Sequence, residues 1–154
     1  MTRTVKAPEP VPYKKIVVAL AGKLVNAQVI HEAVRIATIM NAKLIAVHIR
    51  YPKAGKPTMM MEPLPAFDED DIRQHFRKRG YKELADTIPV KIFDGTSSAK
   101  VLARVTKGVD LLVVGHQQRN RILQAISGNP PNVQLVDVVD CPVLIVPNAR
   151  RASK

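Results

Sequence analysis

The sequence has few of the residues on which several classes of protein depend. Its 154 residues include one cysteine, no tryptophan, three tyrosines and three phenylalanines. A lone cysteine, Cys141, excludes an internal disulfide, and no Cys/His cluster is present to hold a metal. With so few aromatic side chains, a surface that stacks the bases of single-stranded nucleic acid is hard to build. We therefore expect a protein of a reducing compartment, with no metal, for which nucleic acid is an unlikely partner.

Long apolar runs are also missing. No run approaches the roughly 20 residues of a membrane-spanning helix, and residues 1–12 are polar and contain prolines, unlike a signal peptide. We expect a cytoplasmic protein without a membrane span. A length of 154 residues with 46% hydrophobic residues suits one domain. We place this domain at residues 13–148, between a flexible basic tail at 1–12 and a second basic tail at 149–154.

The net charge of +11 is the one unusual total. Such a charge attracts anions, including nucleotides, acidic proteins, nucleic acid and acidic lipid. Much of the excess lies near the two ends of the chain, in Arg3, Lys6, Lys14 and Lys15 and in Arg150, Arg151 and Lys154. We interpret these residues as solvated tails. Their use in binding nucleic acid or an acidic lipid surface is an alternative hypothesis, which predicts binding that falls steeply with salt.

Apolar runs and helical periodicity alternate along the chain. Five runs predict buried strands at residues 15–20, 44–49, 90–93, 109–114 and 141–147. Four helices are predicted between them: residues 24–41, a charged helix from Asp68 that Gly80 weakens or breaks, a helix ending at Gly108, and one opened by Pro130 and Pro131. Residues 51–65, with four prolines, predict an irregular surface loop.

This alternation predicts an α/β fold in three layers, a Rossmann-like five-stranded parallel sheet with helices on both faces. In such sheets ligands bind at the carboxyl ends of the strands. Gly115 and His116 follow the strand predicted at residues 109–114 and therefore lie at that edge.

Four segments together resemble the universal stress protein family: residues 14–20, 41–49, 108–116 and 140–147. The resemblance covers about residues 13–148. It implies the fold just described and a homodimer in which the last strands of two subunits pair, here through Val143, Leu144, Ile145 and Val146. It also implies a regulatory or stress-response role through a protein or transporter partner, without enzymatic activity.

Many members of that family bind ATP through an aspartate after the first strand and a loop of the form Gly-x2-Gly-x9-Gly-Ser/Thr. This chain keeps Gly115 and Gly128 but has Ala21, Gln118 and Asn129 at the other three positions. The next two residues are prolines, which have no backbone N–H for phosphate. In this the chain resembles the branch of the family that lacks the complete loop. We expect no ATP binding in the usual mode.

The alternative is a sensor of ATP, AMP or a cyclic nucleotide, in which Arg119 and Arg121 replace the lost donors. The resemblance and the sheet topology give a candidate nucleotide site made of Ala19, Leu20, Ala21, Val47, Gly115, His116, Gln118, Arg119, Arg121, Gly128 and Asn129. ATP and AMP are the cofactors that this alternative would take.

No residue pattern indicates catalysis. Ser97 and Ser98 are not part of a Gly-x-Ser-x-Gly motif, which would mark a hydrolase nucleophile, and we interpret them as helix caps. For His48 and His116 we expect structural hydrogen bonds. We expect His31 and His75 to be partly solvated side chains on helices. Cys141 is expected to be an inert, small apolar residue.

Overall fold

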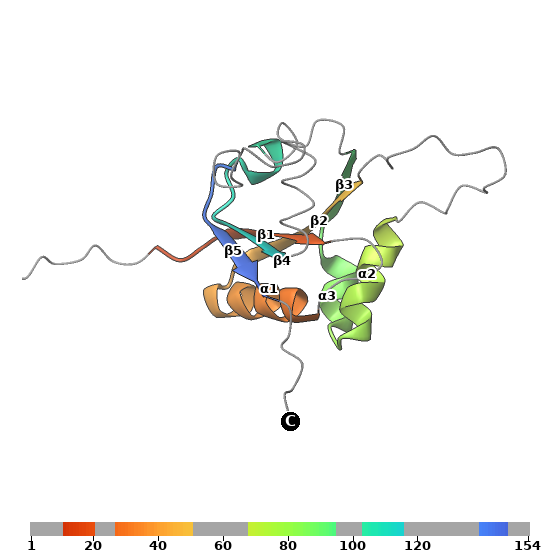
Figure 1. The fold of residues 1–154 in the computed structure, drawn as a ribbon. Coiled ribbons are helices and arrows are strands. Elements are labelled where there is room, and N and C mark those ends of the chain that lie inside the picture. Colours follow the sequence, from red (N-terminus) through yellow and green to blue (C-terminus); the bar gives the residue numbers. More distant parts are fainter. Residues whose placement is uncertain (1–10, 21–26, 51–67, 95–102, 116–138, 148–154) are drawn as a thin grey trace, which may run out of the picture.

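The computed structural model describes residues 11–20, 27–50, 68–94, 103–115 and 139–147 (Figure 1). Within these ranges it contains β1 (Lys15–Leu20), α1 (Ala27–Met40), β2 (Lys43–Arg50), α2 (Glu69–Lys78), α3 (Lys82–Thr87), β3 (Val90–Asp94), β4 (Leu111–Gly115) and β5 (Val143–Val146). The predicted strands are therefore all present, with ends at most two residues away from those expected. The expected surface loop, the helix opened by Pro130 and most of the two tails lie outside the described residues.

The five strands form one sheet in the order β3-β2-β1-β4-β5, and all neighbours run parallel. Ile16, Val17, Val18, Ala19 and Leu20 of β1 are all buried. A strand at the centre of a sheet has neighbours on both sides and helices on both faces, so every one of its side chains meets protein. The continuous apolar run of β1 is the sequence signature of that position, and the predicted α/β class is confirmed.

Figure 1 shows α1, α2 and α3 on one face of the sheet and the helical residues 103–106 on the other. The core is divided accordingly. Ile16, Val18 and Leu20 pack with α1 and with Ile72 and Phe76 of α2, whereas Val17 and Ala19 pack with residues of the opposite face such as Leu112. The period of two along β1 thus distributes its side chains between two apolar layers.

Local chemistry explains the limits of α2. The side chain of Asp68 accepts a hydrogen bond from the backbone N–H of Asp71, and Asp71 accepts one from that of Asp68, which is a capping box. Gly80, at φ 91°, lies in the left-handed region just beyond the helix. A new short helix, α3, begins at Lys82. The break predicted at Gly80 is confirmed.

Asp110 connects the beginnings of β1 and β4. Its Oδ2 accepts hydrogen bonds from the backbone N–H groups of Lys14 at 2.8 Å and Lys15 at 3.0 Å. These two bonds, with the charge of Lys14, hold the pKa of the Asp110 carboxyl below its ordinary value. The carboxylate is therefore hydrogen-bonded to the backbone where β1 and β4 begin.

Candidate functional site

The order of the strands defines a candidate ligand-binding edge. The chain proceeds from β1 to β2 and β3 on one side and then returns to β4 and β5 on the other side of β1. The helices between β1 and β3 lie on one face of the sheet, whereas the helical residues 103–106 before β4 lie on the other. In sheets of this type, ligands bind at the carboxyl ends of the two strands between which the order reverses, here β1 and β4. Leu20 and Gly115 end these strands.

Four residues of the predicted nucleotide site are described, and two of them come together. Ala19 and Val47 are partners in the register of β1 and β2 and belong to the same buried cluster. Leu20 packs on the opposite face with α1 residues. The other predicted site residues, apart from Gly115, lie outside the described part of the chain: Ala21, His116, Gln118, Arg119, Arg121, Gly128 and Asn129.

Gly115 has a packing reason to be glycine. A Cβ built on it would lie 3.0 Å from the Cγ2 of Val29, near the beginning of α1. That distance is shorter than ordinary carbon–carbon contact, so a larger residue at this position would require Val29 to shift by a few tenths of an ångström. The glycine therefore lets a helix approach the carboxyl end of the sheet.

His48 confirms its expected structural role. Its side chain is only 7% exposed, and its Nδ1 lies 2.9 Å from the backbone oxygen of Leu20. With a hydrogen on Nδ1, the ring donates to that carbonyl and joins the ends of β1 and β2. At the candidate site, the ends of β1 and β2 are thus joined by a side-chain hydrogen bond as well as by the backbone hydrogen bonds of the sheet.

The expectation for His75 was wrong. The residue is 9% exposed, because it lies on the face of α2 that also carries the buried Ile72 and Phe76. Positions three and four residues apart share a helix face, so the charged neighbours in sequence concealed its burial. His31 is partly exposed as expected, but its Nδ1 lies 2.6 Å from the hydroxyl of Tyr81, a contact between distant residues that no local pattern predicts.

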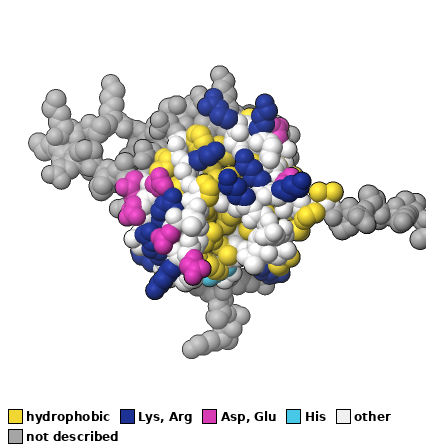
Figure 2. Space-filling view, turned by 180° about the vertical axis from the view of Figure 1, so that it is seen from behind, with side chains coloured by type: hydrophobic (Ala, Val, Ile, Leu, Met, Phe, Trp, Pro, Cys, Tyr) yellow, Lys and Arg dark blue, Asp and Glu magenta, His cyan; other side chains and the backbone are white. Residues whose placement is uncertain are grey.

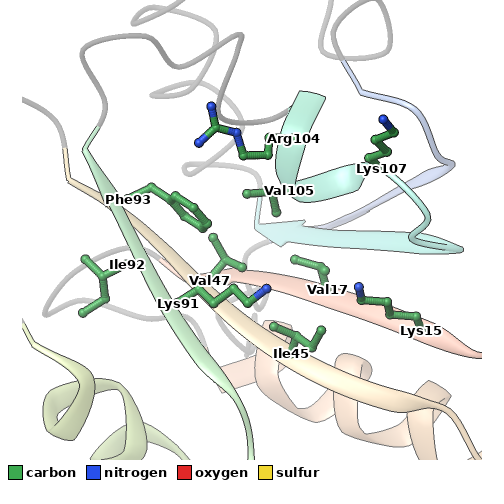
Figure 3. A pocket seen from close by; sticks show the side chains of 10 residues that line it. All are labelled: Lys15, Val17, Ile45, Val47, Lys91, Ile92, Phe93, Arg104, Val105 and Lys107. Carbon is green, nitrogen blue, oxygen red and sulfur yellow. The ribbon is translucent and has the colours of Figure 1, made fainter.

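A cavity of about 410 Å³ lies against the sheet face opposite α1 (Figure 3). Val17, Ile45 and Val47 form its apolar floor. Phe93 and Val105 stand above this floor, and Ile92 also borders the cavity. Four cations complete the lining: Lys15, Lys91, Arg104 and Lys107. Of all these residues only Val47 had been predicted as a site residue.

The cations were missed because they come from separate segments of the chain. Lys91 interrupts the apolar run of β3, and this interruption was the one local signal of a polar position on that strand. Lys107 precedes the glycine that ends a helical segment, where a lysine is ordinary. Only the fold shows that they border one space.

Cys141 has the character of an inert thiol. Burial, followed by the nearby carboxylate of Asp140, raises its pKa to about 11 from the ordinary 9.0. The protonated thiol is thus favoured in the folded chain. The contribution of the protonated thiol to the stability of the fold is complete below pH 9 and is lost as the pH rises through about 11.

We predict that iodoacetamide alkylates Cys141 in the folded protein at pH 8 about 100-fold more slowly than in the urea-unfolded chain. The thiolate is the reactive form, and the raised pKa lowers its fraction from about one in ten to about one in a thousand. Mass spectrometry of timed samples would measure both rates. Rates within threefold of each other would show that the thiol is not suppressed by the fold.

Neither a metal centre nor a membrane helix is found in the described part of the chain. No three His, Cys, Asp or Glu side chains there lie close enough to hold a metal ion. No helix within the same ranges is both long and apolar enough to cross a membrane.

A five-stranded parallel sheet with helices on both faces, whose strand order reverses between β1 and β4, defines an α/β protein of the Rossmann-like type. The sequence matches the universal stress protein family over residues 12–147. The chain belongs to that family. No curated protein sequence matches it.

Solved structures of universal stress proteins have the same fold. One, in complex with cAMP, is 22% identical, with a TM-score of 0.53, over 90% of this chain and 99% of its own. UspA from Lactobacillus plantarum is 20% identical, with a TM-score of 0.53, over 89% and 99%. A universal stress protein from Archaeoglobus fulgidus is 17% identical, with a TM-score of 0.50, over 86% and 98%.

Proposed function

We propose that this chain is a dimeric, non-enzymatic regulatory protein of the stress response, which acts in the cytoplasm through a protein or transporter partner. The observation that carries the proposal is the position of β5 at the edge of the sheet. Its side chains are Val143, Leu144, Ile145 and Val146, and Ile145 is 41% exposed. An apolar edge strand invites pairing, and a two-fold dimer satisfies it in both subunits at once.

The hydrogen-bond pattern of β5 indicates which groups are available for that pairing. The backbone N–H of Leu112 in β4 donates to the backbone oxygen of Pro142 at 2.9 Å. Because donors alternate along a parallel ladder, the N–H groups of Leu144 and Val146 point to β4, and those of Val143 and Ile145 point outward. Val143 and Ile145 therefore offer backbone donors to a second subunit, and Ile145 adds an exposed apolar side chain.

The histidines that the structure describes support a role without catalysis. His31 contacts Tyr81, His48 bonds the backbone of Leu20, and His75 lies within 3.5 Å of Arg79. The rings of His31 and His48 thus take part in contacts between structural elements, and that of His75 in a contact at the end of its own helix. The single cysteine fits a reducing compartment.

Sedimentation velocity tests the dimer directly. A sample at about 5 μM should sediment mainly as a species of twice the 17.0 kDa chain mass. A monomer at this concentration would contradict the proposal, whereas a tetramer that Ile145 variants leave intact would place the interface elsewhere.

Nucleotide sensing is the second candidate function. It is favoured by the reversal of the strand order between β1 and β4, beside which Ala19 and Val47 are register partners. The cAMP complex of a related protein suggests which ligands to try. Calorimetric titration with ATP, AMP and cAMP should then show a dissociation constant below about 10 μM, near −7 kcal/mol. Replacing Arg119 or Arg121 with alanine should weaken this binding at least tenfold. Flat titrations with all three nucleotides would exclude this candidate.

A further inference from the structure

The cavity opposite α1 gathers positive charge from three parts of the chain. Lys15 begins β1, Lys91 comes from β3, and Arg104 and Lys107 come from the helical residues 103–106 and the turn after them. In Figure 3, the side chains of Lys15 and Lys91 extend toward each other along the floor, while Arg104 and Lys107 stand above it. Cations are thus found on the floor and on the opposite wall.

The floor between these cations is apolar. Val17 and Ile45 are register partners on β1 and β2, and Val47 follows on the same face two residues later. The ring of Phe93 leans over Val47 at the end of the cavity away from Lys15 (Figure 3). One end of the cavity is therefore apolar and aromatic, and the other is cationic.

No carboxylate is present among the described residues that line the cavity. The ion pairs formed within the described ranges are on α1, α2 and α3, which cover the other face of the sheet. Asp110 is next to Lys15 in the fold but binds the backbone N–H groups of Lys14 and Lys15.

Figure 2 shows several Lys and Arg side chains beside hydrophobic side chains in the middle of the view, whereas the acidic side chains at the left are interleaved with Lys and Arg. Like charges around a partly desolvated space repel one another, and an anion between them would relieve that repulsion.

We propose that this cavity binds a small amphipathic anion, with a carboxylate or phosphate near Lys15, Lys91 and Lys107 and an apolar ring or chain against Val47 and Phe93. A volume of about 410 Å³ suits such a ligand. The proposal uses neither the segment from Gly115 to Asn129 nor the edge of β5. It is therefore independent of both functions proposed above.

The test uses two fluorescent probes that differ in one charged group. The first, 1-anilinonaphthalene-8-sulfonate, carries a sulfonate in place of the carboxylate or phosphate, and the second, N-phenyl-1-naphthylamine, has the same rings without it. The full chain should bind one molecule of the anionic probe. The double variant Lys91→Ala and Lys107→Ala should weaken this binding at least tenfold and that of the neutral probe less than twofold.

A matched control removes two lysines that are exposed and do not line the cavity. The double variant Lys43→Ala and Lys82→Ala has the same net charge as the test variant, and it should bind the anionic probe within twofold of the natural chain. Circular dichroism verifies that each variant is folded. Arg104→Ala supplies a further, independent loss of at least threefold, because Arg104 is exposed and can be removed without loss of core packing.

Three results would overturn the proposal. The first is an equal loss of affinity in the control variant, which would mean attraction by net charge alone. The second is a loss on Arg119→Ala as large as that of the test variant, which would place the probe at the glycine loop. The third is absence of binding by the full chain, which would mean that the chain itself fills the cavity.

Discussion

Replacing Ile145 with lysine is expected to convert the protein from a dimer to a monomer at micromolar concentration. Ile145 is the exposed apolar residue of the edge strand β5, and its backbone N–H points away from β4. A two-fold axis through this edge would bring both substituted lysines into one interface. Each charge would then lose water without gaining a partner. We expect the dissociation constant to rise at least 100-fold, about 2.7 kcal/mol.

The control for this experiment is the same substitution at Ile39. That residue is 70% exposed on α1, on a helix that covers a face of the sheet and not its edge. Ile39→Lys should leave the sedimentation coefficient and the dissociation constant unchanged. If both variants remain dimeric, the last strand is not the interface, although the stress-response role could still be served through another surface.

Replacing Phe76 with alanine is expected to lower the free energy of unfolding by about 3–5 kcal/mol. The helix α2 has the sequence EDDIRQHFRK, and only Ile72, His75 and Phe76 are buried. Phe76 is fully buried in the cluster that joins α2 to α1 and the sheet. Its removal takes away most of the apolar surface that attaches a strongly charged helix to the core, and the residual cavity adds to the loss.

Urea unfolding at one fixed protein concentration would measure this change, because the stability of a dimer depends on concentration. Ile39→Ala is the matched control, and its exposed position predicts a change within about 0.5 kcal/mol. A loss below about 1 kcal/mol for Phe76→Ala would show that α2 contributes little to the stability of the domain.

The strands were predictable because their signal is local. The run at residues 15–20 is apolar without interruption, and its place at the centre of the sheet, with helices on both faces, accounts for that composition. The end of α2 was predictable for a similar reason. Gly80 adopts the left-handed conformation that glycine permits, and no distant contact is needed to explain the break.

The candidate site was predictable only in part. The resemblance to the family indicated Ala19 and Val47, which the register of β1 and β2 does bring together. The resemblance gave no indication that Val29 approaches Gly115 closely, since that contact joins residues 86 positions apart. His75 was misjudged for the same reason, because its burial depends on which side of α2 faces the core.

The sequence by itself determined the order and type of the elements and membership of the family, because apolar runs, caps and glycines act over a few residues. Only the tertiary structure decided which side chains share a space. Lys15, Lys91 and Lys107 belong to three separate segments, and the parallel register with its crossovers places them around one apolar floor. Long-range juxtaposition follows from the packing of whole strands and helices, and no local pattern encodes it.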